Sequence, residues 1–392
     1  MVFVLLLLLL SVFQTTGKQQ PIGVCYGRVA NNLPPAQEVI HLYISNGIRK
    51  MRIYDPDPAT LQALRGSHIE LVIGVPNEDI QSLASDAAEA THWVQNNILN
   101  YSQDVKFRYI VVGNEINPTS ATSQFVLPAM QNIYAALTSA NLQSQIKVST
   151  AIELSLLGSS YPPSAGEFNP SSSSYISPIV SFLVNNGAPL LANVYPYFSY
   201  IGDTNNVNLG YALFNSSTVV VKDGEYEYQN IFSAQLGALY AALEKVGAPD
   251  LEVVVSESGW PSDGGTAATV DNAQAYYKNL INHVRFGTPN RPNQPIETYL
   301  FAMFDENQKG PAETERHFGL FTPQKQPKYQ ISFTNQPYTV KSCSPRLTRE
   351  GFSFSFDLGV SLQQQTPKFS ILVQSSAVNA TNAFSAGFSC TS

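Results

Sequence analysis

Eight short apolar segments recur along the chain, at 21–27, 48–55, 69–75, 107–115, 146–152, 189–198, 251–260 and 296–304. Most are followed by an amphipathic stretch, such as DPATLQALRG, that opens with Pro or Asp and closes on Gly, as helices commonly do. A strand followed by a helix, repeated in this way, predicts parallel strands joined by helical crossovers. We therefore predict an α/β fold with a single (β/α)8 TIM barrel. A doubly wound open sheet is disfavoured because the sequence lacks its glycine-rich phosphate-binding turn.

The two ends of the chain depart from this pattern. Residues 1–18 contain a leucine-rich run that is too short to span a bilayer and is followed by small and polar residues. This predicts a cleaved signal peptide, with a signal anchor as the alternative. Residues 19–333 hold the predicted barrel, and residues 334–392 are rich in Ser, Gln and Thr, with one alternating run at 352–360. We interpret this C-terminal extension as either a small β-hairpin element or a flexible tail.

One connection inside the predicted barrel is unusually long. Residues 199–229, after the sixth predicted strand, are largely polar. An insertion that follows a barrel strand lies at the C-terminal face, where loops carry function. We therefore expect this segment to form one wall of a cleft.

The composition narrows the classes of function. The 392 residues include 22 basic and 29 acidic side chains, for a net charge of −7. This balance argues against nucleic acid and against an anionic membrane as partners. It favours an uncharged ligand that is bound by hydrogen bonds and aromatic faces, for which 20 Tyr and 21 Phe are available.

Cysteines and sequons add expectations for a secreted chain. Cys25 lies in an apolar run and is predicted to be a buried thiol, whereas Cys343 and Cys390 can pair in the extension. No histidine accompanies them at ligand spacing, so we expect no metal site. N-glycans are predicted at the sequons of Asn100, Asn215 and Asn379. We expect a monomer.

Three predicted strands end in glutamate, and barrel enzymes take their working residues from strand ends of this kind. The segment VVGNE ends in Glu115, VVVSE ends in Glu257, and FAMFDEN contains Glu306. Two carboxylates that converge on one rim suit glycoside hydrolysis, because like charges in proximity push their pKa values apart and provide an acid and a base. The alternative for each glutamate taken alone is a structural ion pair.

Strand alternation predicts which way these carboxylates point. Glu257 has the parity of Val253 and Val255, and Glu115 has the parity of Val111, so each is expected to face the same side as those valines. A separation of about 5–5.5 Å between the two carboxyl groups would give retention of anomeric configuration, whereas about 6.5–9.5 Å would give inversion.

Several motifs resemble the signature segments of plant glycoside hydrolase family seventeen, the β-1,3-glucan endohydrolases. They are IGVCYGRVANNLPP, MRIYDPD, VVGNEI, NVYPYFSY, VVVSESGWPS and FAMFDENQKG, and the resemblance covers about residues 21–333. It implies retaining hydrolysis of internal β-1,3 linkages in callose-like or fungal-wall glucans, without metal or cofactor. Three alternatives remain open: hydrolysis of mixed-linkage β-1,3-1,4-glucan, transfer of the glycosyl group to another glucan, and a glucan-binding protein without activity.

The resemblance also implies residue roles. Glu115 matches the family's acid/base and Glu257 matches its nucleophile, while Asn114 matches a residue expected to bond the sugar 2-hydroxyl. A supporting polar cluster behind the pair comprises Glu306, Lys309 and Glu315. The expected cleft aromatics are Tyr54, Tyr195 and Phe198, with core packing as their alternative role.

Further expectations concern residues beside these motifs. Lys309 is expected close to Glu257, where its charge would offset the cost of placing a carboxylate at the end of a buried strand. Trp260 is expected either to floor the sugar site or to pack the barrel top, and we favour a role in both. Asp305 stands where relatives often carry Asn and is expected to shift the pH profile. The leader predicts secretion to the cell exterior, and the vacuole is the alternative if the extension is a sorting signal.

Overall fold

The computed structural model describes residues 21–333, 346–348, 351–355 and 370–371. Contacts divide the chain after residue 334 into two units, which are described separately. The predicted signal peptide (residues 1–18), Cys343, Cys390 and the sequon at Asn379 lie outside the described residues. In the second unit, an antiparallel sheet contains β15 (Arg346–Thr348), β16 (Gly351–Ser355) and β17 (Ser370–Ile371).

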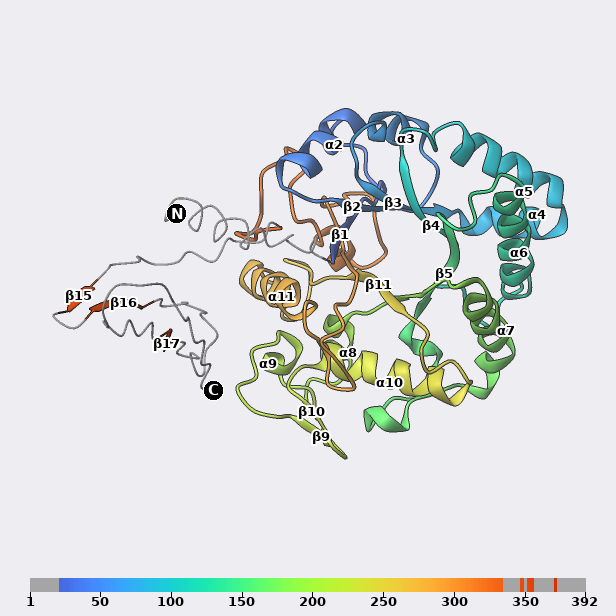
Figure 1. The fold of residues 1–392 in the computed structure, drawn as a ribbon. Helices are drawn as coiled ribbons and strands as arrows, with labels where there is room; N and C mark the ends of the chain where they lie inside the picture. Colours follow the sequence, from blue (N-terminus) through green and yellow to red (C-terminus); the bar gives the residue numbers. More distant parts are fainter. Residues whose placement is uncertain (1–20, 334–345, 349–350, 356–369, 372–392) are drawn as a thin grey trace, which may run out of the picture. The chain divides into compact units, whose positions relative to one another are not determined.

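Parallel strands close into a barrel in the order β1-β14-β11-β8-β5-β4-β3-β2 (Figure 1). These strands are β1 (Ile22–Cys25), β2 (Lys50–Ile53), β3 (Glu70–Val75), β4 (Lys106–Asn114), β5 (Lys147–Glu153), β8 (Leu190–Asn193), β11 (Val253–Ser258) and β14 (Thr298–Leu300). Each one overlaps one of the apolar segments, and the predicted (β/α)8 barrel is confirmed. Runs of β-branched and long apolar residues fit strands that are covered on both faces.

Helices surround the barrel (Figure 1). They include α2 (Ala36–Ser45), α3 (Pro58–Leu64), α4 (Ile80–Ser85), α5 (Ala87–Val94), α6 (Ser123–Ser139), α7 (Pro170–Asn186), α10 (Ile231–Lys245) and α11 (Val270–His283). Side chains fix their starts, since Asp57 accepts a hydrogen bond from the Thr60 N–H in α3 and Asn230 accepts one from the Ser233 N–H in α10. In the described part of the chain, no helix is long and apolar enough to cross a membrane.

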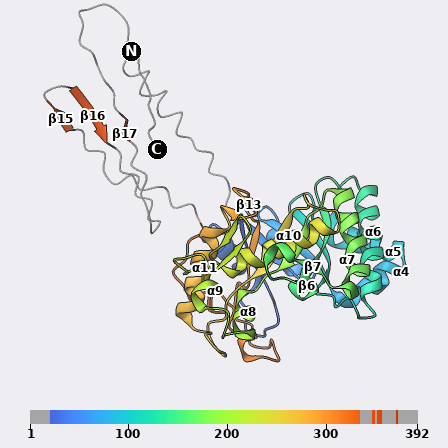
Figure 2. The same ribbon diagram turned by 90° about the horizontal axis from the view of Figure 1, so that it is seen from below.

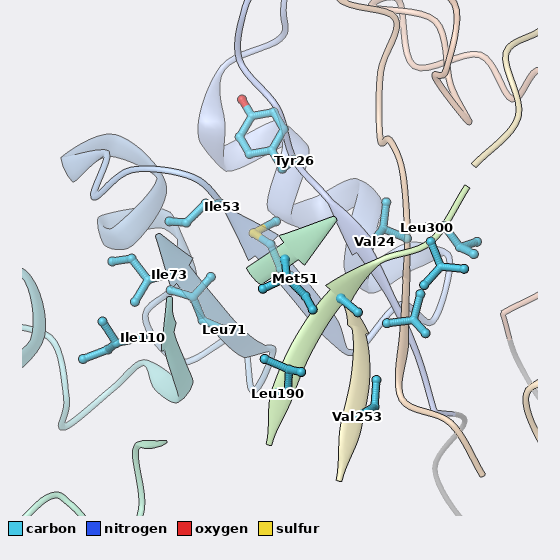
Figure 3. Packing of buried hydrophobic residues seen from close by; sticks show 14 of the residues in the cluster. Val24, Tyr26, Met51, Ile53, Leu71, Ile73, Ile110, Leu190, Val253 and Leu300 are labelled. Atoms are coloured by element: carbon cyan, nitrogen blue, oxygen red, sulfur yellow. The ribbon is translucent and has the colours of Figure 1, made fainter. Parts of the chain in front are cut away.

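The barrel wall separates two apolar layers. Residues that alternate along the strands, among them Met51, Ile53 and Leu71, pack outward against the helices (Figure 3). The intervening residues form a second cluster inside the barrel that contains Val72 and, fully buried, the thiol of Cys25, as predicted. Because Arg52 lies between two outward-facing neighbours, strand alternation turns its side chain into the barrel.

Charged side chains meet at the amino-terminal end of the barrel, where the buried Glu297 and Lys50 and the partly exposed Arg108 form a group that we call the charged plug. Glu297 accepts hydrogen bonds from Arg108 Nε at 3.0 Å and Nη2 at 2.5 Å, and from the Tyr299 hydroxyl at 2.8 Å. Lys50 Nζ lies 3.3 Å from Glu297 and 2.7 Å from Glu70. The carboxylate of Glu297 is therefore removed from water with its charge compensated, as burial of a charge requires.

The predicted insertion forms a separate group of small elements. It begins within α8 (Pro196–Gly202) and contains α9 (Leu209–Ala212) and the hairpin of β9 (Val221–Asp223) and β10 (Tyr226–Tyr228). In Figures 1 and 2, α8, α9 and α11 lie on one side of the barrel and α4–α7 on the other. The hairpin is attached through Asp223, which accepts hydrogen bonds from the N–H and hydroxyl of Ser164. Two further pairs are β6 (Leu157–Ser159) with β7 (Glu167–Phe168) and β12 (Gly287–Thr288) with β13 (Arg291–Pro292).

The charged plug predicts that replacing an arginine within it destabilises the protein more than replacing an exposed lysine elsewhere. Arg108→Met leaves Glu297 short of its main partner, and we expect the free energy of unfolding to fall by about 2–4 kcal/mol. The matched control is Lys222→Met, which removes an exposed bridge to Glu227 and should change stability by less than about 1 kcal/mol. Urea denaturation measures both, and similar small losses in the two variants would show that the plug contributes little.

Candidate active site

A cleft of about 1710 Å³ opens beside the carboxyl ends of the strands. Its lining includes Glu115 from the end of β4, Glu257 from β11 and Glu306 from the loop after β14. The insertion supplies part of the wall, including Asp203 and Val220, as predicted. Ordinary small-molecule pockets occupy about 300–1,000 Å³, so the cleft has room for more than one sugar ring.

The Glu257 side chain is held by three donors. Its Oε1 accepts hydrogen bonds from Arg52 Nη1 at 2.9 Å and from the Tyr54 hydroxyl at 2.7 Å. Its Oε2 accepts one from the Tyr195 hydroxyl at 2.7 Å. The side chain is only 6% exposed, and these contacts both stabilise its charge and leave it one orientation.

The predicted parity of Glu257 is wrong. Val253 and Val255 belong to the outer layer against the helices, whereas Val254 belongs to the cluster inside the barrel. The register of β11 against β8 shifts between Val255 and Glu257, which is a β-bulge. The additional residue re-aims the carboxylate into the cleft, so alternation counted from the valines fails.

Arg52 is the cation that contacts Glu257. The expectation that Lys309 lies near Glu257 stays a prediction. Arg52 Nη1 also donates to Asn193 Oδ1 at 3.1 Å and to the Ser256 carbonyl at 2.9 Å, and its Nη2 donates to Asn114 Oδ1 at 2.7 Å. The guanidinium lies 4.7 Å from the centre of the Tyr54 ring. The residue is 1% exposed, and the acceptors of its Nη1 and Nη2 groups are residues of the site.

Glu115 lies in a different environment. Its Oε1 accepts a hydrogen bond from Asn193 Nδ2 at 2.8 Å, while the carboxyl group remains open to the cleft. The surrounding walls remove part of its hydration and raise the pKa of Glu115 to about 7, and the negative charge of Glu257 adds to this effect. Glu115 is therefore suited to hold a proton at mildly acidic pH.

Asn193 and Asn114 connect the two carboxyl groups. Asn193 donates to Glu115 and to Asn114 Oδ1, while its own Oδ1 accepts from Arg52 and from the Ser256 hydroxyl. The Arg52 N–H groups thus determine which way both amides point. Asn114 consequently turns its NH2 group away from Arg52, an orientation compatible with the predicted bond to a sugar hydroxyl.

The predicted supporting cluster is brought together. Lys309 Nζ lies 3.4 Å from Glu315 Oε2 and 3.9 Å from Glu306 Oε2, and Glu306 Oε1 accepts a hydrogen bond from the Val29 N–H at 2.8 Å. Burial raises the pKa of the Glu306 carboxyl above its usual value, and the charge of Lys309 opposes that shift. A Cβ at position 27 would lie 2.5 Å from the Glu306 carboxylate, so any side chain there would displace Glu306.

The three predicted cleft aromatics line the cleft but differ in their contacts. Tyr54 and Tyr195 use their hydroxyl groups to hold Glu257. Phe198 makes no such bond, is 42% exposed, and packs against the rings of Tyr195 and Phe318 at 5.4 and 6.5 Å. An open face of this kind suits stacking on a sugar ring.

The two residues beside the motifs have structural contacts. Trp260 is fully buried, donates its indole N–H to the Ala267 carbonyl, and is not among the residues that line the cleft. It therefore packs the barrel top and does not floor a sugar site. Both carboxylate oxygens of Asp305 accept hydrogen bonds from Lys328, so this charge is paired, and its effect on the pH profile stays a prediction.

Arg52 and Asn193 were not predicted, although each left a signal. Arg52 is a charged residue inside the apolar run MRI, and Asn193 ends the apolar run LLAN. A polar side chain in a strand that is buried on both faces needs a hydrogen-bond partner. Both positions could therefore have been identified as candidates for a buried polar network. Among the described residues, no group of three His, Cys, Asp or Glu side chains is arranged to hold a metal ion.

The sequence profile described as glycosyl hydrolases family 17 matches residues 22–333. The chain belongs to glycosyl hydrolase family 17. A glucan endo-1,3-beta-glucosidase from Vitis vinifera is 65% identical over 337 residues, which cover 85% of this chain and 98% of that protein. A relative from Nicotiana plumbaginifolia, named as a basic vacuolar isoform of the same enzyme, is 52% identical and covers 84% of this chain and 90% of its own.

A solved structure agrees with this family membership. CJP38, a beta-1,3-glucanase and allergen of Cryptomeria japonica pollen, has 46% sequence identity and a TM-score of 0.77. The match covers 80% of this chain and 99% of that chain. As a family 17 glycosyl hydrolase, the protein is an enzyme, and the cleft with Glu115 and Glu257 is its candidate active site.

The contacts of Arg52 predict the effect of replacing it. In Arg52→Met the site loses the donor that Glu257, Asn114 and Asn193 share, and we expect kcat/KM for laminarin to fall on the order of 100-fold or more through misplacement of the carboxylate. Arg52→Lys keeps the charge but not the fork of donors, and it should recover only part of the loss. Steady-state kinetics measure both. Full recovery in the lysine variant would mean that charge alone matters.

Proposed function

We propose that this family 17 glycosyl hydrolase cleaves internal β-1,3-glucosidic bonds of β-1,3-glucans such as callose or fungal-wall glucan. The observation that carries the proposal is the pair of carboxyl groups on one cleft in opposed environments. Glu257 is surrounded by donors, whereas Glu115 has a pKa raised to about 7. The names of the relatives support the choice of linkage, and the size of the cleft supports attack within a chain.

In the proposed reaction, Glu115 gives its proton to the glycosidic oxygen as the bond to the leaving chain breaks. Glu257 attacks the anomeric carbon and forms a glycosyl-enzyme. Glu115, now ionised, takes a proton from water, whose oxygen then attacks the same carbon and releases Glu257. Two inversions at that carbon give net retention, and Glu115 ends the cycle protonated.

The neighbouring residues have assigned roles in this proposal. Arg52, Tyr54 and Tyr195 hold Glu257 in the orientation needed for attack and stabilise its charge when it leaves again. Asn114 directs its amide N–H toward the sugar 2-hydroxyl, and Phe198 stacks on a neighbouring ring. The charged cluster of Glu306, Lys309 and Glu315 supports the cleft on the side of Glu257.

The remaining expectations about the protein in its cell are also part of the proposal. We infer a secreted, monomeric glycoprotein, with delivery to the vacuole as the alternative that the basic vacuolar relative supports. The sequons at Asn100 and Asn215 lie on exposed residues, which is compatible with N-glycans at both.

The pKa of Glu115 predicts the basic limb of the pH profile. Below about 7 the carboxyl group is protonated and able to act as the acid; as the pH rises through about 7 it ionises, and we expect kcat/KM for laminarin to fall. The measurement is kcat/KM from pH 5 to 9 in Glu115→Gln and the unmodified enzyme. The variant should lose this limb together with most activity, and a flat profile in the unmodified enzyme would count against Glu115 as the acid.

A product profile tests the reaction and the linkage. We expect faster turnover of laminarin than of mixed-linkage β-1,3-1,4-glucan, and the β-anomer should appear first by NMR. Glu257→Gln should reduce kcat by at least about 1,000-fold, as loss of a nucleophile does. Equal or faster turnover of the mixed-linkage polymer would contradict the assignment of β-1,3-glucan as the substrate. Products longer than the substrate would indicate transfer to glucan, and binding without turnover would indicate a glucan-binding protein.

A further inference from the structure

The backbone that presents Glu115 is irregular. Gly113 has φ +88° and Glu115 has φ +53°, a left-handed conformation that residues with a side chain seldom adopt. The register of β4 against β5 also shifts between Val111 and Asn114. A regular strand would send Asn114 and Glu115 to opposite faces, whereas here both side chains reach the site. The irregular conformation therefore needs contacts that hold it.

Asn77 supplies two of these contacts from the loop after β3. Its Oδ1 accepts a hydrogen bond from the Asn114 N–H at 2.9 Å, and its Nδ2 donates to the Asn114 carbonyl at 3.0 Å. The backbone pairing of β3 with β4 ends at Val75 and Val112. Asn77 and Asn114 each lie two residues beyond this last pair. The two hydrogen bonds of the Asn77 amide therefore replace the backbone hydrogen bonds that the next pair of residues would make. Pro76, which has no N–H, interrupts the backbone pairing at this point.

Other contacts on the same segment come from β5. The Glu115 N–H donates to the Ala151 carbonyl at 2.9 Å, and the Thr150 hydroxyl donates to the Gly113 carbonyl at 3.0 Å. Each of the two peptide groups that flank Asn114 is thus bonded twice: its Asn114 atom bonds the Asn77 side chain, and its other polar atom bonds β5.

We propose that Asn77 is a positioning residue for the acid/base, which acts by clamping the Asn114 backbone so that the Glu115 carboxyl group points at Asn193 and the cleft. The inference rests on the proposed role of Glu115. No hydrogen bond in the described part of the chain joins the Asn77 side chain to Glu115 or Glu257. Asn77 also lines the cleft, and the effect proposed for it on the acid passes through the Asn114 backbone.

Leaving-group dependence gives the sharpest test. A poor leaving group such as a sugar needs a proton from the acid, whereas dinitrophenolate leaves without one. In Asn77→Ala, we expect kcat/KM for laminarin to fall about 100-fold, while kcat/KM for a dinitrophenyl β-laminaritrioside changes less than about threefold. Retained activity on the activated substrate also shows that the variant is folded.

The pH profile provides a second readout. The charged groups that face Glu115 are Glu257 from β11, Glu153 from the end of β5 and Arg52 from β2. Within the described residues, the Asn77 side chain makes no hydrogen bond to any of the three. The exposed Glu78 beside Asn77 also lines the cleft. Because all four remain in Asn77→Ala, a weakened basic limb for laminarin would report displacement of the acid itself.

Two reference variants separate the possible outcomes. Asn132→Ala removes an amide that donates to the Leu83 and Ala84 carbonyls away from the cleft, and it should leave the leaving-group dependence unchanged. Glu115→Ala should show the dependence in its strongest form. Equal losses of Asn77→Ala on both substrates, or a higher KM with unchanged kcat, would overturn the positioning role alone. Equal losses of Glu115→Ala on both substrates would overturn the assignment of the acid, and the inference with it.

Discussion

Arg52 carries a full positive charge inside the barrel, and the active site is arranged around it. The side chain is 1% exposed, and a guanidinium that is removed from water must find acceptors for its N–H groups. The acceptors come from the ends of three other strands, as Asn114 from β4, Asn193 from β8, and Ser256 with Glu257 from β11. Because one rigid planar group binds all of them, satisfying a single buried charge also sets the positions of the strand ends relative to one another. Glu257 is therefore oriented by a requirement of folding as much as by the chemistry.

The same network gives two identical side chains different properties. Glu257 receives three hydrogen bonds, one of them from a cation, whereas Glu115 receives one from the neutral Asn193. The walls of the cleft remove part of the hydration of Glu115 and raise its pKa, and the charge of Glu257 raises it further. The division of a carboxyl pair into one proton donor and one ionised group thus follows from where the donors are placed. Asn193 bonds both Glu115 and Arg52, so a substitution of Asn193 would affect the acid and also the cation that holds the nucleophile.

The parts of the structure that follow from periodicity were predictable from the sequence, and the parts that depend on contacts across the barrel were not. Every barrel strand overlaps an apolar segment, because strands covered on both faces must be apolar throughout. The rule that barrel sites lie at strand ends then brought Glu115 and Glu257 to one cleft. Strand alternation mispredicted the direction of Glu257, because nothing in the segment VVVSES indicates the register shift that follows Val255. The contact of Arg52 with Glu257 spans 205 positions, and nothing in the motif MRIYDPD, which contains Arg52, indicates its partner.

These failures of regularity occur where the site needs them. A regular strand delivers one side chain of each neighbouring pair to the cleft, yet the site uses Asn114 together with Glu115, and the Ser256 hydroxyl together with the Glu257 carboxylate. Both pairs lie at register shifts, in β4 and in β11. Only a local distortion places two adjacent groups on one side, and a distorted strand end has lost part of its ladder. Its backbone groups must then be bonded by side chains, as the amide of Asn77 does for Asn114. The site thus requires adjacent residues of one strand to face the same side. This requirement explains the irregular backbone, the additional polar side chains that bond it, and the convergence of the functional groups.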